Sequence, residues 1–285
     1  MGPHVLGVVH PVTERSWLVQ LKPNRRLAYA GASLVILVVV TALALSFAHG
    51  GLLSRNATPK IIATQATAGA QRQGAYQYRE LPLGPFDQLK VSGPFKVAVL
   101  VSEQPARLRI AGPSAQLADT IASVEGGILT IRFREGASWS WNPGDGVNIV
   151  VSTPDLASVS LEGAADVEVN GVRRDMFSAS TEGSGSVTVR RLAAGNVQLA
   201  TSGAGGITVD GRARDGTYVV GGAGSIDAKR LRVQTATIAI GAAGSAYADV
   251  SRTANISVSG HGRVEIVGGA TCITQPANSR QVECR

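Results

Sequence analysis

The chain has 285 residues, 44% of them hydrophobic, so it is long enough to bury a core and too apolar for a disordered protein. Aromatic residues make up only 5% while there are 34 glycines, so small side chains must fill much of the interior. Of the net charge of +7, residues 1–26 and 49–78 contribute +3 each, and the nearly neutral remainder does not favour a basic groove for nucleic acid.

The first predicted element is an apolar segment at residues 27–48, LAYAGASLVILVVVTALALSFA, which has no charged residue and no histidine. As a helix it spans roughly 33 Å, the thickness of a bilayer core. Basic residues at 22, 25 and 26 precede it, so the positive-inside rule predicts a cytoplasmic N-terminal segment at 1–26. We therefore expect a single-pass inner-membrane protein whose C-terminal domain is periplasmic or otherwise extracytoplasmic.

A cleavable signal peptide is the alternative interpretation of this segment, because Ser46-Phe47-Ala48 has the small-x-small pattern of a cleavage site. The apolar run is longer than the usual core of a signal peptide, which favours an uncleaved signal anchor. Residues 49–78 follow, rich in Ala, Gly, Thr and Gln without apolar periodicity, and we interpret them as a flexible linker.

Residues 79–160 contain apolar stretches that indicate strands with irregular spacing: FDQLKVSG, FKVAVLVS, ARLRIAG, GGILTIRF and GVNIVVS. A short helix is predicted at 114–123, with Ser114 as its N-cap. We expect this irregular part to cover the N-terminal end of the more regular structure that follows.

The most distinctive feature is a glycine-rich element that recurs six times at spacings of 20, 20, 19, 20 and 18 residues. Such a constant period is typical of repeat architectures. The six elements begin at Gly163 (GAADVEV), Gly183 (GSGSVTV), Gly203 (GAGGITV), Gly222 (GAGSIDA), Ala242 (AAGSAYA) and Gly260 (GHGRVEI).

Each glycine element lies between two segments that alternate apolar and other residues, as Val159 and Leu161 do before Gly163 and Val167 and Val169 do after it. Alternation with period 2 indicates strands with one buried face. Two strands per 20-residue coil predict an all-β parallel β-helix or solenoid with rungs about 4.8 Å apart. We expect the glycines to allow tight corners with positive φ.

Stacked coils place equivalent residues side by side, which allows a prediction about charge. The position seven residues after each alignment point reads Asn170, Arg190, Asp210, Lys229, Asp249 and Val267. Four consecutive members alternate in sign. We therefore expect a ladder of opposite charges that helps to fix the register, although each exposed pair contributes little.

The C-terminal tail, residues 271–285, contains the two cysteines of the chain, Cys272 and Cys284. Their proximity and the extracytoplasmic location predict a disulfide, which stabilises the fold by about 3 kcal/mol in the chain-entropy model. A metal site is the alternative, but no histidine or third cysteine lies nearby. We expect no cofactor and no metal.

Residues 79–270 resemble the head GIN domain family, also called putative auto-transporter adhesins. The resemblance rests on FDQLKVSGPFKVAVLVSEQPARLRIAG, on VNIVVSTPDLASVSLEGAADVEV and on the recurring xGxGxV coils. It implies a β-helical, extracytoplasmic domain and no catalytic residues. The chain departs from the pattern at Ala242, which replaces a glycine, and in its cysteine-bearing tail.

Four residues are candidates for ligand contact. Glu162 and Glu182 occupy the same place in adjacent coils and could act as paired carboxylates or hold a cation, although two solvated acids are the simpler interpretation. Trp139 and Trp141 could stack on a sugar ring or cover a strand. His261 is expected to be a solvent-exposed substitution.

The sequence contains no phosphate loop, nucleophile elbow or HExxH motif. It favours a non-catalytic role in binding, adhesion or envelope scaffolding, with a cell-envelope polysaccharide, another envelope protein or a second copy of the chain as partner. The alternative is a β-helical polysaccharide lyase or hydrolase that uses carboxylates near Glu162 and Glu182. Small residues dominate the outward columns, which favours contact with a surface over catalysis: Ser160, Ser180, Ala200, Val219, Ala239 and Ser257.

Overall fold

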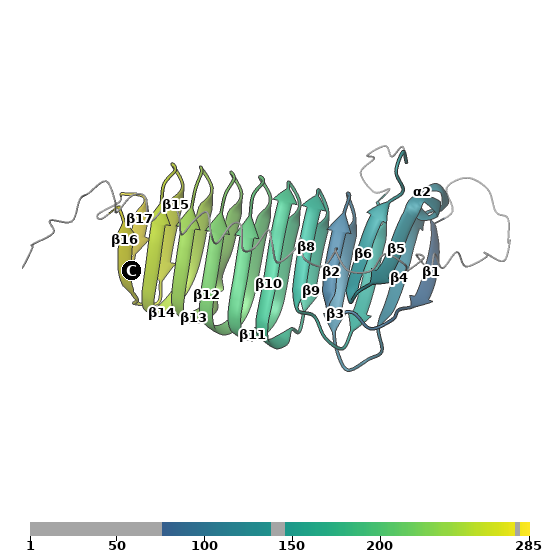
Figure 1. Cartoon of the computed structure of the whole chain (residues 1–285), viewed down its shortest axis with the longest axis horizontal. Coiled ribbons are helices and arrows are strands. Elements are labelled where there is room, and N and C mark those ends of the chain that lie inside the picture. The colour runs from purple at the N-terminus through teal and green to yellow at the C-terminus, as the bar shows by residue number, and fades with distance from the viewer. Residues whose placement is uncertain (1–75, 138–145, 277–279) are drawn as a thin grey trace, which may run out of the picture. The chain divides into compact units, whose positions relative to one another are not determined.

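The computed structural model describes residues 76–137, 146–276 and 280–285, which form one short helix and seventeen strands (Figure 1). The anchor predicted at 27–48 lies outside these ranges, and within them no helix is long and apolar enough to cross a membrane. The elements are β1 (Tyr76–Pro82), β2 (Gln88–Ser92), β3 (Lys96–Val101), β4 (Arg107–Pro113), α2 (Ser114–Asp119), β5 (Thr120–Glu125), β6 (Ile128–Phe133), β7 (Asn148–Thr153), β8 (Ser158–Gly163), β9 (Asp166–Asn170), β10 (Arg173–Gly183), β11 (Ser186–Thr201), β12 (Gly206–Val220), β13 (Ser225–Ile240), β14 (Ser245–Val258), β15 (Arg263–Val267), β16 (Thr271–Gln275) and β17 (Val282–Cys284).

The strands form a solenoid of about six regular coils, in which each coil contributes one segment to each of two facing columns of parallel strands (Figure 1). The first column runs from β6 through β2 and β8 to the C-terminal parts of β10–β14 and ends at β16. The second runs from β7 through β3 and β9 to the N-terminal parts of β11–β14 and ends at β15 and β17. The predicted all-β solenoid with coils of about 20 residues is confirmed.

The alternating residues of the repeats face the interior between the two columns. All of the apolar positions named above are buried: Val159 and Leu161 are 0% exposed, and Val167 and Val169 are 2% and 0% exposed. Burial of small and β-branched side chains from both columns supplies most of the stabilisation of a stack whose coils cannot fold alone. Tyr218 is the largest side chain in this interior, and its burial raises the pKa of the hydroxyl.

The first coils of the stack do not follow chain order. Strands β2 and β3 lie between the β6–β7 coil and the β8–β9 coil, with parallel pairing on both sides. Antiparallel strands then end the stack, since β5 pairs with β6, β4 pairs with β7 and β1 pairs with β4. Residues 79–160 therefore add two coils to the solenoid as well as covering its end.

The predicted helix is shorter than expected and is capped differently. Helix α2 ends at Asp119, and Thr120 begins β5, which pairs with β6. Ser114 is the first helical residue, Pro113 occupies the N-cap position, and no side chain caps the helix. The prediction of a helix to residue 123 with Ser114 as N-cap was wrong, because pairing with β6 outweighs local helix propensity in TIASVE.

The turns from the first column to the second form what we call the glycine edge, residues 162–165, 182–185, 202–205, 221–224, 241–244 and 259–262. Gly183 has a φ of +119°, as predicted, but Gly203, Gly205 and Gly222 do not have positive φ. A Cβ on Gly205 would overlap the carbonyl oxygen of Gly185 in the preceding coil. Close stacking of backbones, more than unusual φ, therefore requires glycine at this edge.

The turns from the second column back to the first form the opposite edge, residues 170–176, 190–196, 210–216, 229–235 and 249–253. Here β11, β12, β13 and β14 stay paired to their neighbours as the chain turns, but the register shifts between Val189 and Leu192, and again in each of the next two pairings. These β-bulges place extra residues in single coils.

The bulges overturn the predicted charge ladder. Asp210 pairs in register with Arg230 rather than Lys229, and Asp249 lies opposite Arg232. Lys229 Nζ instead lies 3.0 Å from Glu265 Oε2, two coils away along the chain. The expectation of one column of alternating charges was wrong because the number of residues per coil changes at the position of those charges.

The predicted disulfide between Cys272 and Cys284 is present, and it joins β16 of the first column to β17 of the second. The last coil of the stack is thereby closed by a covalent bond. Because a terminal coil has a neighbour on one side only, this link stabilises the strands with the fewest backbone partners.

Candidate functional site

The acidic pair predicted at the glycine edge is present as a register pair, with Glu182 directly opposite Glu162. Glu162 is not free, however, because Lys90 Nζ of the adjacent coil lies 2.7 Å from its Oε1. Glu182 is exposed and has no partner among the described residues. Glu162 is thus held by a lysine and Glu182 is solvated, which is a common arrangement of charges on a protein surface. A role of the two glutamates in ligand contact stays a prediction.

The other candidates of the sequence do not join this pair. Trp139 and Trp141 lie outside the described residues. His261 is exposed at the glycine edge, as predicted. The described residues contain no group of three or more His, Cys, Asp or Glu side chains that could hold a metal ion.

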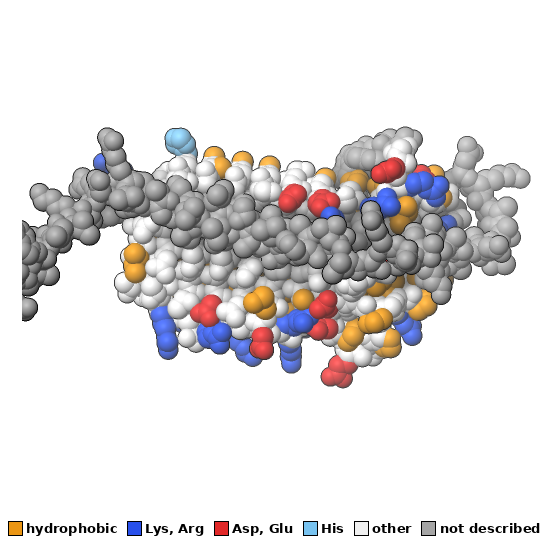
Figure 2. All heavy atoms as spheres, viewed as in Figure 1, with side chains coloured by type: hydrophobic (Ala, Val, Ile, Leu, Met, Phe, Trp, Pro, Cys, Tyr) orange, Lys and Arg blue, Asp and Glu red, His pale blue; other side chains and the backbone are white. Residues whose placement is uncertain are grey.

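Positive charge gathers at the edge opposite the glycine edge, which we call the basic edge. Its five segments contain ten Lys and Arg residues and four Asp residues, a net charge of +6. The six segments of the glycine edge contain two glutamates and no lysine or arginine. Figure 2 shows blue side chains concentrated along one margin of the stack. The near-neutral total of residues 79–285 had concealed this separation.

Four of these ten basic side chains form an ion pair with an acid, namely Arg174, Arg190, Arg214 and Lys229. Arg190 Nε lies 2.6 Å from Glu168 Oε1, and Arg214 Nε lies 2.8 Å from Asp215 Oδ2. Hydrogen bonds donated by Thr235 and Arg214 lower the pKa of the Asp215 carboxyl, so it stays ionised at neutral pH. Such exposed pairs hold local geometry and contribute little to stability.

A second group of arginines is exposed and has no ion pair or hydrogen bond within the described part of the chain: Arg173, Arg212, Arg230, Arg232 and Arg252. Three of them share one register column, in which Arg173 pairs with Ala193, Ala193 with Arg212, and Arg212 with Arg232. Like charges on neighbouring rungs repel one another. The column continues to Asp249, which lies opposite Arg232 but forms no ion pair with it among the described residues, so the row of three arginines keeps a net positive charge that attracts anions.

Arg191 lies beside this column on the rung that carries Ala193. Its backbone has a φ of 56°, the only positive value at a residue other than glycine among the described residues. The Arg191 N–H donates to Asp210 Oδ1 at 2.7 Å, and its Nε donates to Asn170 Oδ1 at 2.6 Å. The first bond holds the backbone and the second holds the side chain, whose terminal nitrogens have no protein partner in the described residues. Unusual backbone geometry held in this way often marks a functional position.

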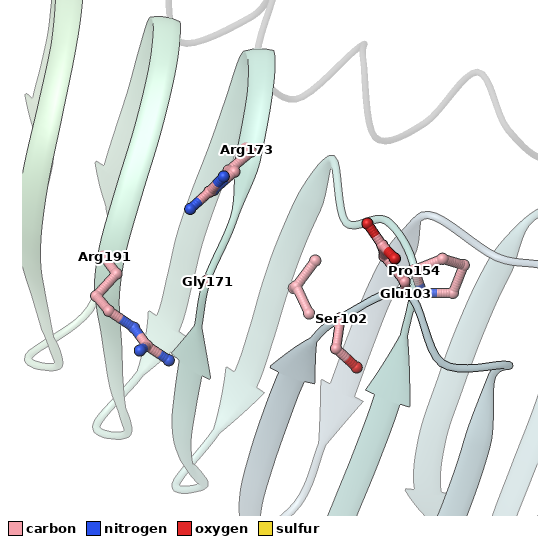
Figure 3. Close-up of a pocket in the computed structure, with 7 residues that line it drawn as sticks. Ser102, Glu103, Pro154, Gly171, Arg173 and Arg191 are labelled. Carbon is pink, nitrogen blue, oxygen red and sulfur yellow. The ribbon is translucent and has the colours of Figure 1, made fainter.

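Two shallow hollows adjoin these arginines. The first, of about 350 Å³, has Arg173 and Arg191 on one side and Glu103 and Pro154 on the other (Figure 3). The second, of about 440 Å³, is lined by Arg173, Arg191, Leu192, Ala193, Gly211 and Arg212. The second hollow has three guanidinium groups, small apolar walls and no acidic residue, so it suits an anionic group attached to a larger ligand.

The chemistry offered by this edge is recognition. A guanidinium group binds carboxylate, sulfate or phosphate oxygens with two parallel hydrogen bonds and keeps its proton at any physiological pH. General acid–base catalysis needs a group that can exchange protons near neutral pH. Among the residues that line the second hollow, none does so.

The sequence did contain a signal for this edge that its linear charge total did not reveal. Basic pairs recur after the second strand of successive coils, as VRRD at 172–175, RRL at 190–192, GRARD at 211–215 and KRLR at 229–232. Aligning the coils on their corners, rather than counting residues from the glycines, brings these pairs together. Counting residues from the glycines fails because the bulges change the number of residues between each glycine and its basic pair.

Comparison with known proteins supports the fold. The chain is similar to the crystal structure of a putative adhesin from Bacteroides fragilis, with a TM-score of 0.66 and 18% identity over 76% of this chain and 95% of that chain. It is also similar to the crystal structure of a putative lipid binding protein from Parabacteroides distasonis, with a TM-score of 0.59 and 16% identity over 74% of this chain and 94% of that chain. A putative adhesin from Parabacteroides merdae gives a TM-score of 0.53 with 16% identity over 74% and 94%.

No curated protein matches the chain. At these identities the solved structures establish a shared fold. A family model described as "Putative auto-transporter adhesin, head GIN domain" matches residues 85–270, about two thirds of the sequence and nearly the whole of the described solenoid. The chain therefore belongs to the head GIN domain family of putative auto-transporter adhesins.

Proposed function

We propose that this chain is a non-catalytic binding or adhesion protein, tethered to the inner membrane by residues 27–48, that presents its solenoid on the extracytoplasmic side. Family membership and the putative adhesins among its structural neighbours support a binding or adhesion role. The apolar segment, the basic residues before it and the disulfide support the location.

One observation carries the binding role. The described surface concentrates positive charge in an open edge that repeats from coil to coil, with exposed arginines that form no ion pair in the described residues. A repeated, open and rigid row suits a partner that is itself extended. An enzyme site would instead gather acid and base groups in one enclosed groove.

The alternative, a polysaccharide lyase or hydrolase, relies on Glu162 and Glu182. The ion pair of Glu162 with Lys90 argues against it, because one of the two carboxylates is already engaged by a lysine of the adjacent coil. A direct test is to incubate the full chain with envelope polysaccharide and follow release of reducing ends. Release that disappears in Glu162→Gln and Glu182→Gln variants would establish the enzyme and refute our proposal.

The membrane location can be tested separately. The full chain should sediment with the membrane fraction after washing at high pH, and protease added outside spheroplasts should digest the solenoid but leave a fragment containing residues 27–48. Recovery of the intact chain in the soluble fraction would contradict the anchor. Loss of residues 1–48 from the mature protein would favour the cleaved signal peptide instead.

The binding role is tested with isolated envelope material. The full chain should bind preparations of wall or outer-envelope polysaccharide, and should bind less after these are digested by glycosidases. No binding to any envelope fraction would refute the proposed role.

A further inference from the structure

We infer that the basic edge is a binding site for one linear acidic polysaccharide, which lies along the stack and places its carboxylate groups on Arg173, Arg191, Arg212 and Arg232. This inference rests on the proposed binding function and adds the chemical class of the ligand and the residues that hold it. Neither the glycine edge nor the predicted residues Glu162 and Glu182 take part.

The first support is the placement of the four arginines on successive rungs, three of them in one register column and Arg191 two positions before that column. They come one each from four consecutive rungs, β10, β11, β12 and β13. Rungs of a parallel stack are about 4.8 Å apart, so the row covers about 14 Å. The spacing of about 4.8 Å between rungs is similar to the length of one sugar unit in an extended polysaccharide. Successive units of a uronic acid chain can therefore each meet a guanidinium group.

The second support is that none of the four arginines forms an ion pair in the described residues, whereas their neighbours on the same edge do. Arg190, Arg214 and Lys229 each have an acidic partner within 3.0 Å. Arg212 and Arg232 lie opposite each other on adjacent strands with no such partner. Asp249 lies opposite Arg232 on its other side and offsets part of the repulsion, and an anion bound beside Arg212 would offset the rest.

The third support is the preorganisation of Arg191. Its side chain is held by Asn170 and its backbone by Asp210, although the left-handed conformation costs an ordinary residue free energy. A held guanidinium loses little conformational entropy on binding. The hollow beside it has walls of Leu192, Ala193 and Gly211, which leave space for the ring of a sugar.

The arrangement fits a polysaccharide better than a membrane or a nucleic acid. The four arginines form a narrow row, and three acids lie on the same edge, Asp175, Asp210 and Asp215. A planar anionic membrane would contact the whole edge, so its headgroups would meet these acids as well as the arginines. Single-stranded nucleic acid is usually held by aromatic side chains that stack on bases. No aromatic residue lines either hollow.

The test measures binding of polygalacturonate to the full chain held in nanodiscs of zwitterionic lipid. We expect saturable binding that weakens with added salt, as contacts between exposed charges do. The Arg173→Gln, Arg212→Gln, Arg232→Gln triple variant should bind at least about tenfold more weakly, because the loss of even one charge-assisted hydrogen bond has about that effect.

The matched control removes three positive charges elsewhere. Arg79, Lys96 and Arg107 are exposed, have no ion pair in the described residues and lie outside the basic edge. The triple variant with glutamine at these positions should keep its affinity within about twofold. Equal losses in the two triple variants would mean that only net charge matters, and would overturn the site.

A second measurement uses the unaltered protein, so it does not depend on the folding of a variant. Phenylglyoxal modifies exposed arginines, and mass spectrometry locates the modified residues. Saturating polygalacturonate should slow modification of Arg173, Arg191, Arg212 and Arg232 severalfold and leave Arg79 and Arg107 unchanged. Protection that is uniform, or absent, would overturn the inference.

Two further probes separate other ligands. One probe is a vesicle that contains phosphatidylglycerol, and the other is a single-stranded oligonucleotide. If either binds as tightly as polygalacturonate and through the same arginines, the site is for a different class of partner and the inference is wrong. If envelope material binds equally well to the wild type and to the Arg173, Arg212, Arg232 variant, the binding function stands and this site is wrong. If the wild type binds no envelope material, the proposed function itself fails.

Discussion

The two edges of the solenoid differ in how they tolerate changes in the chain. Across the glycine edge the pairing never shifts: Thr181 pairs with Thr201 before one turn, and Ser186 pairs with Gly206 after it, twenty positions apart in both cases. Across the basic edge the same pair of strands changes from Val189 with Val209 to Leu192 with Gly211, which is nineteen positions apart. All variation in coil length occurs at the second edge.

The difference follows from how closely the backbones approach. At the glycine edge, amide groups of one coil donate to carbonyl groups of the previous one, as Gly205 does to Gly183 at 2.9 Å. A Cβ on Gly203, Gly205 or Gly222 would overlap a carbonyl oxygen of the previous coil. The basic edge carries long side chains that point into solvent, so an additional residue only forms a bulge. One edge therefore sets the stacking, and the other is free to carry a recognition surface.

The largest expected effect is at the glycine edge. Gly205→Ala adds a Cβ that overlaps the carbonyl oxygen of Gly185, so neighbouring coils must separate. We expect a loss of about 3 kcal/mol in the free energy of unfolding, as for overpacked cores, measured by urea denaturation.

The adjacent Gly206→Ala is the matched control. A Cβ at this position has Ser225 Oγ as its nearest neighbour, at an ordinary contact distance of 3.5 Å. It should change stability by less than about 1 kcal/mol and could raise it, because alanine restricts the unfolded chain. Similar losses for both variants would show that backbone stacking does not explain the glycine repeat.

The sequence alone predicted what depends on local pattern. Alternation identified the buried positions of both columns, the glycine period identified one edge, and the spacing of Glu162 and Glu182 placed them on adjacent rungs. The pairing of Cys272 with Cys284 was also correct. The buried positions, the glycine edge and the acidic pair follow from a period of 2 or of about 20 residues, and the disulfide follows from two cysteines that lie close together in the sequence.

Features that depend on long-range choices could not be predicted in this way. Strand β2 has two parallel neighbours, β6 and β8, and nothing in its sequence QLKVS specifies that it lies between them. The bulge at Arg190 and Arg191 occurs within a nearly constant repeat length, so the charge ladder was assigned to the wrong residues. For the same reason the arginine row was missed.

The next effect in size concerns the basic edge. Arg191→Gly removes the side chain and suits a φ of 56° better than arginine does. Stability should change by no more than about 1 kcal/mol, since relief of strain offsets the lost hydrogen bonds and the flexibility of glycine. Affinity for polygalacturonate should fall about tenfold.

Calorimetry and urea denaturation of the same preparation measure both quantities. Arg190→Gly, whose side chain is paired with Glu168, is the control and should keep most of the affinity. A large loss of stability in Arg191→Gly without a loss of affinity would show that Arg191 supports the fold and does not bind.

A smaller effect is expected from the acidic pair of the glycine edge. Glu162→Gln removes the ion pair with Lys90, whose side chain is 43% exposed, so the free energy of unfolding should fall by only about 0.5 kcal/mol. Glu182→Gln should have no measurable effect on stability. Neither variant should bind polygalacturonate more weakly, and a clear loss in either would move the ligand site to the glycine edge.

The smallest effect is a change in one pKa at the basic edge. Thr235 Oγ1 donates to Asp215 Oδ1 at 2.5 Å, and this bond is the main reason why the pKa of Asp215 is lowered, followed by the bond from Arg214. A lowered carboxyl pKa contributes stability at neutral pH that is lost as the pH falls through the folded-state value. Thr235→Val should raise the pKa of Asp215 towards its ordinary value and narrow the range of acidic pH in which this contribution persists.

Carbon-detected NMR titration of the Asp215 carboxyl measures the shift, and Thr237→Val, at the next outward position of the same strand, should leave it unchanged. An unaltered Asp215 titration in Thr235→Val would mean that Arg214, on the same rung, alone stabilises the ionised carboxylate, and that the hydrogen bond from Thr235 on the next rung contributes nothing to it.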